Sequence, residues 1–330
     1  MHHSHPLLAL TLAACSVGSI TDPPHAPGPS AQQIGALYAA PEPTTPEITI
    51  EQFTRGELTF DVRTGGPKTG EAVIFLHGFP ESSFEWRHQL QPLAAAGYHV
   101  IAPDLRGTGA NAKPKAVEDY SLLVYVEDVL ALADHYGAER FHVVGHDVGG
   151  LVAWGTSQFA GNRVLSLTAV SVPHPGAYAA KLADPDSCQS AASAWYGDLL
   201  KDGAAARLLA GEPPLLVDAW TTLGPEAEAE YRRLLGTPAL LDAAINVWRA
   251  NFIDGQPQGA LPIPVLVPTL YIWGADDPYN CGREAEPLTR SLVWAKYTAE
   301  ELPGRGHFLP EEVPDAFYAS LVSHLRNYAR

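Results

Sequence analysis

The sequence predicts a doubly wound α/β domain, in which helices cover both faces of a mostly parallel sheet. Short, uninterrupted apolar runs recur along the chain, amphipathic helical segments lie between them, and polar side chains follow several of the runs. Strands buried on both faces are typically continuous apolar runs, and their alternation with helices indicates an α/β fold. With 330 residues, 46% of them hydrophobic, the chain is long enough for one large domain carrying an insertion.

The elements follow in a consistent order from residue 47. Residues 47–66 alternate apolar and polar side chains, which predicts a hairpin with one solvated face. A helix is expected over 121–137, where apolar residues recur every three or four positions before a closing glycine. Continuous apolar runs predict buried strands within residues 72–80, 98–107, 141–150, 164–175 and 267–278, with further sheet sequence near 299–310.

The strand rhythm stops between residues 176 and 261. This segment has helix-like and turn-rich sequence but no apolar strand. The predicted organisation is therefore a split core, 47–175 and 262–330, with a helical cap at 176–261.

Residues 1–46 have a different character. An apolar stretch from Leu7 to Ala14 is followed by small residues and Cys15, which is the order of a secretory signal. "LAAC" at 12–15 resembles the lipobox of bacterial lipoproteins and makes Cys15 a predicted lipidation site, and the Pro-rich sequence after it predicts a flexible tether. We expect an exported protein, either a lipid-anchored envelope protein or a secreted or periplasmic one. A cytoplasmic location is expected if the leader is not a signal.

Charge and cysteine content narrow the partners. With 37 acidic and 21 basic residues, the formal charge of −16 repels a phosphate backbone, so no nucleic-acid partner is expected. Cys188 and Cys281 form a disulfide in an oxidising compartment or are two separate buried thiols.

The most informative motif is "VVGHDVGG" at residues 143–150. Hydrolases that expose a nucleophile on a sharp strand-to-helix turn usually have G-x-S-x-G there, but this chain has Asp147 in the middle position. A carboxylate is already ionised at neutral pH and attacks an electrophilic sp3 carbon without a base, forming an alkyl ester. A histidine must then activate water to attack the ester carbonyl, and the sequence offers His307 in "GRGHFLP".

The polar features lie where parallel strands end, which is where open α/β sheets bind ligands. They are "HGFP" at 77–80, Asp147, "DD" at 276–277 and His307. Their chain order of nucleophile, acid and histidine is that of the α/β-hydrolase triad.

From about residue 47 to 330 the sequence resembles the α/β-hydrolase superfamily, in particular its epoxide hydrolase and haloalkane dehalogenase branch. The resemblance rests on "HGFPESSFEWRHQ", "APDLRGTG", "GHDVGG", "SVPHP" and "GHFLPEE". It implies that the backbone N–H groups of Phe79 and Val148 hold the oxyanion and that His77 and His146 support the loop and the turn. Because "WGADD" matches the family pattern W-G-x-x-D, the resemblance favours Asp277 as the triad acid, with Asp276 as the alternative.

The resemblance also implies which residues donate a proton to the leaving oxygen. Tyr196 in "ASAWYGDLL" is similar to the first of two ring-opening tyrosines, whereas "NVWRAN" has Trp248 where the family has the second. An indole N–H donates a hydrogen bond but does not deliver a proton as a phenol does. There are four alternatives. Tyr178 replaces the second tyrosine, Tyr196 acts with a weaker proton donor, the cap serves another substrate, or Tyr196 and Trp248 are only aromatic packing between cap and core. Val148 stands where haloalkane dehalogenases commonly have Trp, which favours the epoxide hydrolases.

The predicted function is an enzyme that hydrolyses epoxides to vicinal diols through an ester on Asp147, without a cofactor or a metal. Neither a nucleotide-binding glycine motif nor H-E-x-x-H occurs in the sequence. The alternatives are a hydrolytic haloalkane dehalogenase with Trp248 near the halide, an ester or lactone hydrolase with Asp147 as general base, and a non-catalytic surface binding protein. Substrate size, stereochemistry and oligomeric state stay open.

Overall fold

The structure is a computed structural model that describes residues 46–212, 215–253, 256–257 and 262–329. The predicted leader and tether, including Cys15, lie outside the described residues except for Pro46.

An eight-stranded sheet forms the core, with the strand order β1-β2-β4-β3-β5-β6-β9-β10. The first two strands form the predicted hairpin at one edge, and β2 pairs antiparallel with β4, whereas all later neighbours are parallel. The predicted doubly wound α/β fold is therefore confirmed. The strands are β1 (Thr49–Arg55), β2 (Leu58–Gly65), β3 (Ala72–Leu76), β4 (His99–Pro103), β5 (Phe141–His146), β6 (Val164–Val170), β9 (Thr269–Gly274) and β10 (Tyr297–Leu302).

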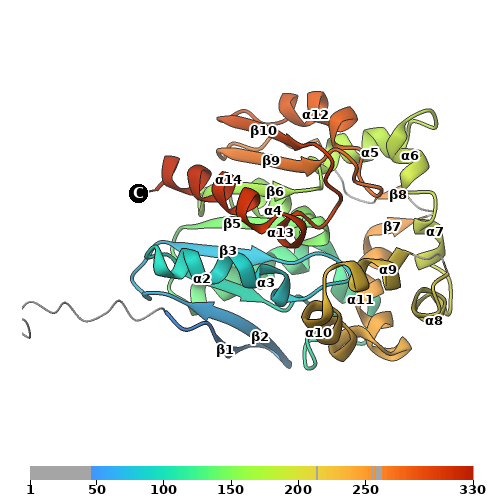
Figure 1. Ribbon diagram of the computed structural model, residues 1–330, viewed down its shortest axis with the longest axis horizontal. Helices are drawn as coiled ribbons and strands as arrows, with labels where there is room; N and C mark the ends of the chain where they lie inside the picture. Colours follow the sequence, from blue (N-terminus) through green and yellow to red (C-terminus); the bar gives the residue numbers. More distant parts are fainter. Residues whose placement is uncertain (1–45, 213–214, 254–255, 258–261, 330) are drawn as a thin grey trace, which may run out of the picture. The chain divides into compact units, whose positions relative to one another are not determined.

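Helices pack on both faces of this sheet (Figure 1). Successive side chains of a strand point to opposite faces, so Val73 and Phe75 of β3 pack toward α2 (Arg87–Ala95) and α14 (Pro314–Asn327). The intervening Ile74 and Leu76 pack in the layer that contains α3 (Leu122–His135) and α4 (Asp147–Phe159). Burial on both faces explains why the strand sequences are continuously apolar.

Shorter elements complete the core. The 3-10 helices η1 (Ser83–Trp86) and η2 (Val117–Tyr120) follow β3 and β4 along the chain. Helix α12 (Gly282–Ser291) lies between β9 and β10 in the sequence, and α13 (Leu309–Glu312) directly follows His307 and Phe308.

Between β6 and β9 the chain forms a cap of helices. Figure 1 shows its helices α7 to α11 gathered beyond the carboxyl ends of the parallel strands. The sequence pattern did not predict the short paired strands β7 (Phe252–Ile253) and β8 (Gln256–Pro257) that follow these helices. The cap helices are α5 (Pro175–Leu182), α6 (Cys188–Ala192), α7 (Tyr196–Leu199), α8 (Ala204–Leu209), α9 (Leu215–Thr222), α10 (Pro225–Leu235) and α11 (Pro238–Asn251).

A disulfide ties the cap to the core. Cys188 at the start of α6 is bonded to Cys281 just before α12, with 6.0 Å between their Cα atoms. The buried Gln189 side chain strengthens this attachment, because its Nε2 donates to the Tyr279 carbonyl at 2.9 Å and its Oε1 accepts from the Cys281 N–H at 3.0 Å. The sequence left open whether the two cysteines form a disulfide or are separate thiols, and the structure contains the disulfide.

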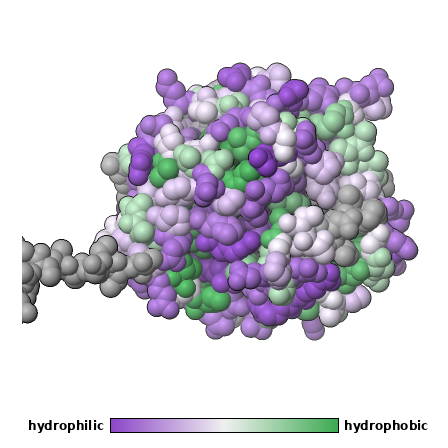
Figure 2. Space-filling model, viewed as in Figure 1, coloured by the Kyte–Doolittle hydropathy of each residue, from purple (hydrophilic) through white to green (hydrophobic). Residues whose placement is uncertain are grey.

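One face of the molecule shows how polar and apolar residues are distributed on its surface. The face seen in Figure 2 is mostly hydrophilic, with small, separate apolar patches. Within the described part of the chain, no helix combines the length and the apolar character that crossing a membrane requires.

Candidate active site

Asp147 lies at a sharp turn between β5 and α4. It is the first residue of α4, and its φ of 48° is in the left-handed region that residues other than glycine seldom adopt. The flanking glycines allow this turn: a Cβ at Gly145 would lie 2.1 Å from the Gly149 carbonyl oxygen, and a Cβ at Gly149 would lie 2.0 Å from the Leu76 carbonyl oxygen. Such strain costs on the order of 1–3 kcal/mol and is concentrated at functional sites.

The structure brings Asp147, His307 and Asp277 together. His307 Nε2 is 3.5 Å from Asp147 Oδ2, and His307 Nδ1 is 2.7 Å from Asp277 Oδ2. The other oxygen of Asp277 accepts backbone N–H bonds from Tyr279 at 2.8 Å and Asn280 at 3.0 Å, which fixes the carboxylate. Asp276 is exposed, so Asp277 is the acid that orients the histidine.

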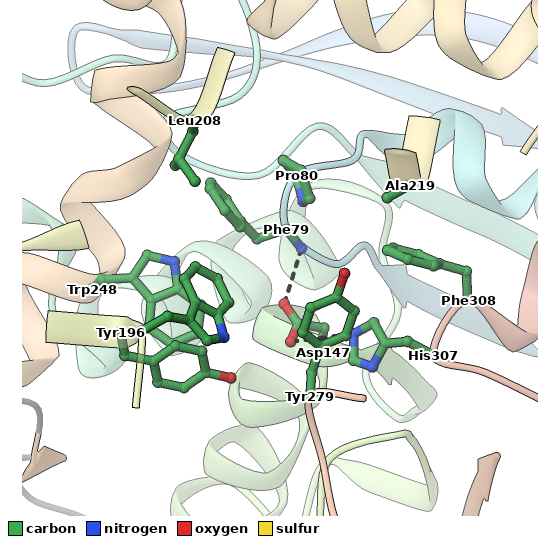
Figure 3. Close-up of a pocket in the computed structure, with 11 residues that line it drawn as sticks. Phe79, Pro80, Asp147, Tyr196, Leu208, Ala219, Trp248, Tyr279, His307 and Phe308 are labelled. Carbon is green, nitrogen blue, oxygen red and sulfur yellow. Dashed lines mark hydrogen bonds and ion pairs between the residues drawn. The ribbon is translucent and has the colours of Figure 1, made fainter. Parts of the chain in front are cut away.

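The two expected oxyanion donors are the backbone N–H groups of Phe79 and Val148. The Phe79 backbone N–H donates to Asp147 Oδ1 at 3.0 Å (Figure 3). Val148 is the second residue of α4, and the first N–H groups of a helix have no acceptor within it. His77 holds the Phe79 loop, because its Nε2 accepts from the Leu105 N–H and its Nδ1 contacts the Gly78 carbonyl, both at 2.8 Å.

His146 lies behind the turn as a buried cation. Its Nδ1 is 3.1 Å from Glu81 Oε2 and 3.0 Å from Glu85 Oε1, and its Nε2 contacts the His307 carbonyl at 2.9 Å. Burial alone would lower the pKa of His146, but the adjacent carboxylates of Glu85 and Glu81 hold it well above the ordinary value. Sequence reasoning placed His146 at the turn but missed both glutamates.

A second hydrogen-bond donor, Ser171, contacts the backbone carbonyl of His307. Ser171, which follows β6, has a φ of 64° and donates from Oγ to the His307 carbonyl at 2.7 Å. His146 and Ser171 thus hold the backbone of His307 from two sides. Ser171 is the first residue of the "SVPHP" motif, but sequence reasoning assigned it no role, because that role depends on its left-handed backbone conformation.

The charges of the nucleophile and the histidine are coupled. Burial would raise the pKa of Asp147, but His307, His146 and the Phe79 N–H together lower it. Burial would lower the pKa of His307, but Asp277 and Asp147 raise it to about 9. At neutral pH the two side chains therefore form an ion pair of a carboxylate and an imidazolium.

These groups open into a largely apolar cavity (Figure 3). Its walls combine core and cap residues, and aromatic side chains predominate. The cavity is lined by Phe79, Pro80, Asp147, Trp195, Tyr196, Leu208, Ala219, Trp248, Tyr279, His307 and Phe308.

Two phenols from the cap lie close to one another near Asp147. Tyr196, at the start of α7, is directed toward Asp147 in Figure 3. Tyr178, on α5, contacts Ser193 Oγ through its hydroxyl at 3.4 Å. Burial raises the pKa of both phenols, and the charge of the nearby Asp147 carboxylate raises it further. Both are therefore protonated donors at neutral pH.

Trp248, on α11, packs among aromatic rings instead of offering a phenol. Its ring centroid is 4.8 Å from that of Tyr196, 5.2 Å from that of Phe252 and 6.1 Å from that of Phe79. Among the described residues its buried Nε1 has no hydrogen-bond partner.

Sequence reasoning did not identify Tyr279, which lines the cavity on the side of the triad. Its ring is 4.9 Å from the His307 ring in an edge-to-face arrangement. The available signal was its position two residues after Asp277, in a turn held by that carboxylate. His174 caps α5 by accepting the Gly176 N–H at 3.0 Å.

Two clusters contain side chains of types that bind metals, but both have other roles in the described structure. In one, Cys188 and Cys281 are bonded to each other beside Glu284. In the other, Glu81 and Glu85 pair with His146. The expectation that the enzyme needs no cofactor or metal stays a prediction.

Comparison with known proteins identifies the family. The model of the alpha/beta hydrolase fold family matches residues 71–314. Epoxide hydrolase A of Mycobacterium tuberculosis is 30% identical, over 82% of this chain and 95% of the relative. The AB hydrolase superfamily protein YfhM of Bacillus subtilis is 29% identical, over 82% of this chain and 95% of the relative.

A solved structure gives the same result. One described under novel epoxide hydrolases of the alpha/beta hydrolases superfamily, from metagenomes of hot environments, has a TM-score of 0.74 and 29% identity. The match covers 84% of this chain and 99% of that one. The fold and the nucleophile turn thus define a hydrolase acting on a small molecule. The chain belongs to the alpha/beta hydrolase fold family, and its relatives include epoxide hydrolases, as the sequence predicted.

Proposed function

We propose that this enzyme hydrolyses epoxides to vicinal diols through an alkyl ester on Asp147. The observation that carries the proposal is the ionised Asp147 carboxylate, 3.5 Å from His307, with the buried phenol of Tyr196 directed toward it. A carboxylate nucleophile with a phenol donor suits a substrate whose leaving group is an alkoxide. The names of the relatives support the same substrate class.

In the first step, an Asp147 oxygen attacks an epoxide carbon and the ring C–O bond breaks. The electron pair of that bond stays on the leaving oxygen, which takes the proton of the Tyr196 hydroxyl. Tyr178 stabilises the resulting phenolate, because its own buried hydroxyl lies close by. This second phenol compensates for Trp248, which has no proton to deliver.

Ester formation changes His307 as well. The ester carries no charge, so His307 loses one of the two carboxylates that raise its pKa. The histidine then releases its proton more readily; passed through solvent, that proton neutralises the Tyr196 phenolate, and His307 becomes the base that the second step requires. Attack thus prepares hydrolysis without any movement of the protein.

In the second step, His307 takes a proton from water while the water oxygen attacks the ester carbonyl. The N–H groups of Phe79 and Val148 hold the oxyanion. The tetrahedral intermediate then collapses and expels the diol oxygen, which takes the proton from His307. The carboxylic acid left at Asp147 then gives its proton to His307, which restores the carboxylate–imidazolium pair of the resting enzyme.

The test uses His307→Gln, which keeps the nucleophile but removes the base. The variant is incubated with epoxides, haloalkanes and lactones, and the intact protein mass is recorded. We expect an adduct with the mass of the whole epoxide, located on Asp147, and no adduct in the matched control Asp147→Asn/His307→Gln. An adduct equal to an alkyl group after halide loss would identify a dehalogenase instead. If wild type cleaves lactones and no adduct forms, Asp147 is a general base.

We also propose that Cys15 is lipidated and that the enzyme is anchored at the cell envelope by residues 1–46. The supporting observation is the "LAAC" sequence after an apolar stretch, together with a disulfide suited to an oxidising compartment. Mass spectrometry of the protein purified from a bacterial host should show a lipid-modified cysteine at the mature N-terminus. A chain that retains Met1, or that has an unmodified Cys15, would contradict the proposal.

A further inference from the structure

Trp248 places a polar N–H in a wall that is otherwise apolar. The residue is 5% exposed, and its Nε1 finds no acceptor among the residues that the structure describes. Buried polar groups of proteins are nearly always hydrogen-bonded, because leaving one unpaired costs its full hydration. Among the unpaired buried donors of the described residues, Trp248 Nε1 belongs to a side chain that lines the candidate active-site cavity, where an acceptor on a substrate would pair with it.

The surroundings of this N–H are aromatic and aliphatic. The rings of Phe79, Tyr196 and Phe252 pack around the indole, and Leu208 lies in the same cavity wall. None of these contacts offers the indole a carbonyl or carboxylate acceptor. An acceptor introduced by a substrate would meet no competing partner there.

The N–H is also separate from the groups that perform the ring opening. In Figure 3 the indole nitrogen is on the side of the ring toward Phe79 and Leu208, whereas the Tyr196 hydroxyl is directed toward Asp147. The epoxide oxygen must lie near the phenols while Asp147 attacks the adjacent carbon. The acceptor for Trp248 is therefore a different atom of the substrate.

We propose that Trp248 determines specificity by donating a hydrogen bond to a second oxygen of the substrate, an ether or carbonyl oxygen on the substituent of the epoxide. This inference rests on the proposed function and names its substrate class as oxygen-substituted, apolar epoxides. It assigns Trp248 a role other than that of the tyrosine found at this position in the family, since the indole binds the substituent and the phenols protonate the ring oxygen.

The test measures binding of two diols to the full-length chain by titration calorimetry. 3-Phenoxypropane-1,2-diol and 4-phenylbutane-1,2-diol differ only by an ether oxygen in place of a methylene group. We expect wild type to bind the ether about fivefold more tightly, as one ordinary net hydrogen bond predicts. Trp248→Phe keeps a ring in the wall and should bind both diols equally. Trp195→Phe removes another indole from the same cavity and should keep the preference.

Equal affinities in wild type, or a preference that survives in Trp248→Phe, would overturn the inference. The corresponding epoxides, phenyl glycidyl ether and 1,2-epoxy-4-phenylbutane, should show the same ratio in kcat/KM. If the diol preference depends on Trp248 but neither epoxide is opened, the proposed function fails while the binding role of Trp248 stands. If both epoxides are opened at ratios that Trp248→Phe does not change, the proposed function stands and this inference fails.

Discussion

Removing the charge of Asp147 should lower the pKa of His307. Asp147→Asn has nearly the shape of the native side chain but, like the ester intermediate, carries no charge. Two unit charges 3.5 Å apart attract by about 1 kcal/mol in a water-like medium and by about 5 kcal/mol at an effective dielectric constant of about 20. Since 1.36 kcal/mol corresponds to one pKa unit, the pKa should fall from about 9 to a value between about 5.5 and 8.

The assay is NMR titration of the imidazole ring of His307 in wild type and in Asp147→Asn, with His307→Gln used to assign the resonance. A pKa that stays near 9 without the Asp147 charge would refute the reasoning. The same coupling predicts a kinetic asymmetry between the two steps. Ester formation should need an ionised Asp147 and a protonated Tyr196, whose pKa burial raises well above its ordinary value, so around neutral pH it should slow only on the acid side. Ester hydrolysis should instead rise with pH through the lowered pKa of His307. Single-turnover measurements of both steps across pH would show whether the two profiles differ.

Three further predictions concern the triad, the phenols and the disulfide. Asp277→Asn should slow ester hydrolysis far more than ester formation, because His307 loses the carboxylate that orients its ring; intact mass spectrometry should detect an accumulated ester, and its absence would contradict the assignment. Tyr196→Phe should slow ester formation by a factor of about 10² to 10⁴, the usual range for general acid catalysis, and Tyr178→Phe should slow it less. Rapid-quench measurements compare the two variants, and a larger effect of Tyr178→Phe would make Tyr178 the proton donor. The double variant Cys188→Ser/Cys281→Ser should lose about 4–5 kcal/mol of unfolding free energy, because the disulfide closes a loop with a sequence separation of 93. Guanidinium denaturation measures this loss, and wild type with the disulfide reduced should show the same loss.

The pH dependence of stability follows from the same raised pKa. His307 binds its proton more tightly in the folded state than in the unfolded state, whose pKa is near 6.5. Its contribution to stability is therefore fully present below about pH 6.5 and is lost as the pH rises through about 9.

The fold could be predicted from the sequence because each part of it leaves a local pattern. Continuous apolar runs such as residues 72–76 mark strands buried on both faces, and "GHDVGG" marks the turn that needs glycines at 145 and 149. The chain order of the nucleophile, the acid and the histidine could also be read, since each follows a strand of the same parallel sheet. Local patterns of this kind do not depend on how the cap folds.

Other features of the site depend on long-range packing and leave no such pattern. Asp276 and Asp277 are adjacent in sequence, and only the backbone of the turn determines that Asp277 contacts His307. Gln189 stands in an unremarkable cap segment, yet its side chain contacts the segment after Asp277. The direction of the Trp248 N–H likewise depends on how α11 packs against the core.

In the proposed mechanism, the buried charges around Asp147 account for a single histidine serving both steps. His146 is held as a cation by Glu81 and Glu85, and Asp277 is held by the Tyr279 and Asn280 N–H groups. These charges stay constant through the reaction, whereas the charge of Asp147 is present before attack and absent in the ester. The nucleophile is thus the variable charge beside His307. An imidazolium stabilises the carboxylate until it attacks, and the loss of that carboxylate then converts the same ring into a base. A serine at position 147 would have no charge to lose, so in the proposed mechanism an aspartate at this turn both forms the bond to carbon and, by losing its charge, makes His307 a base.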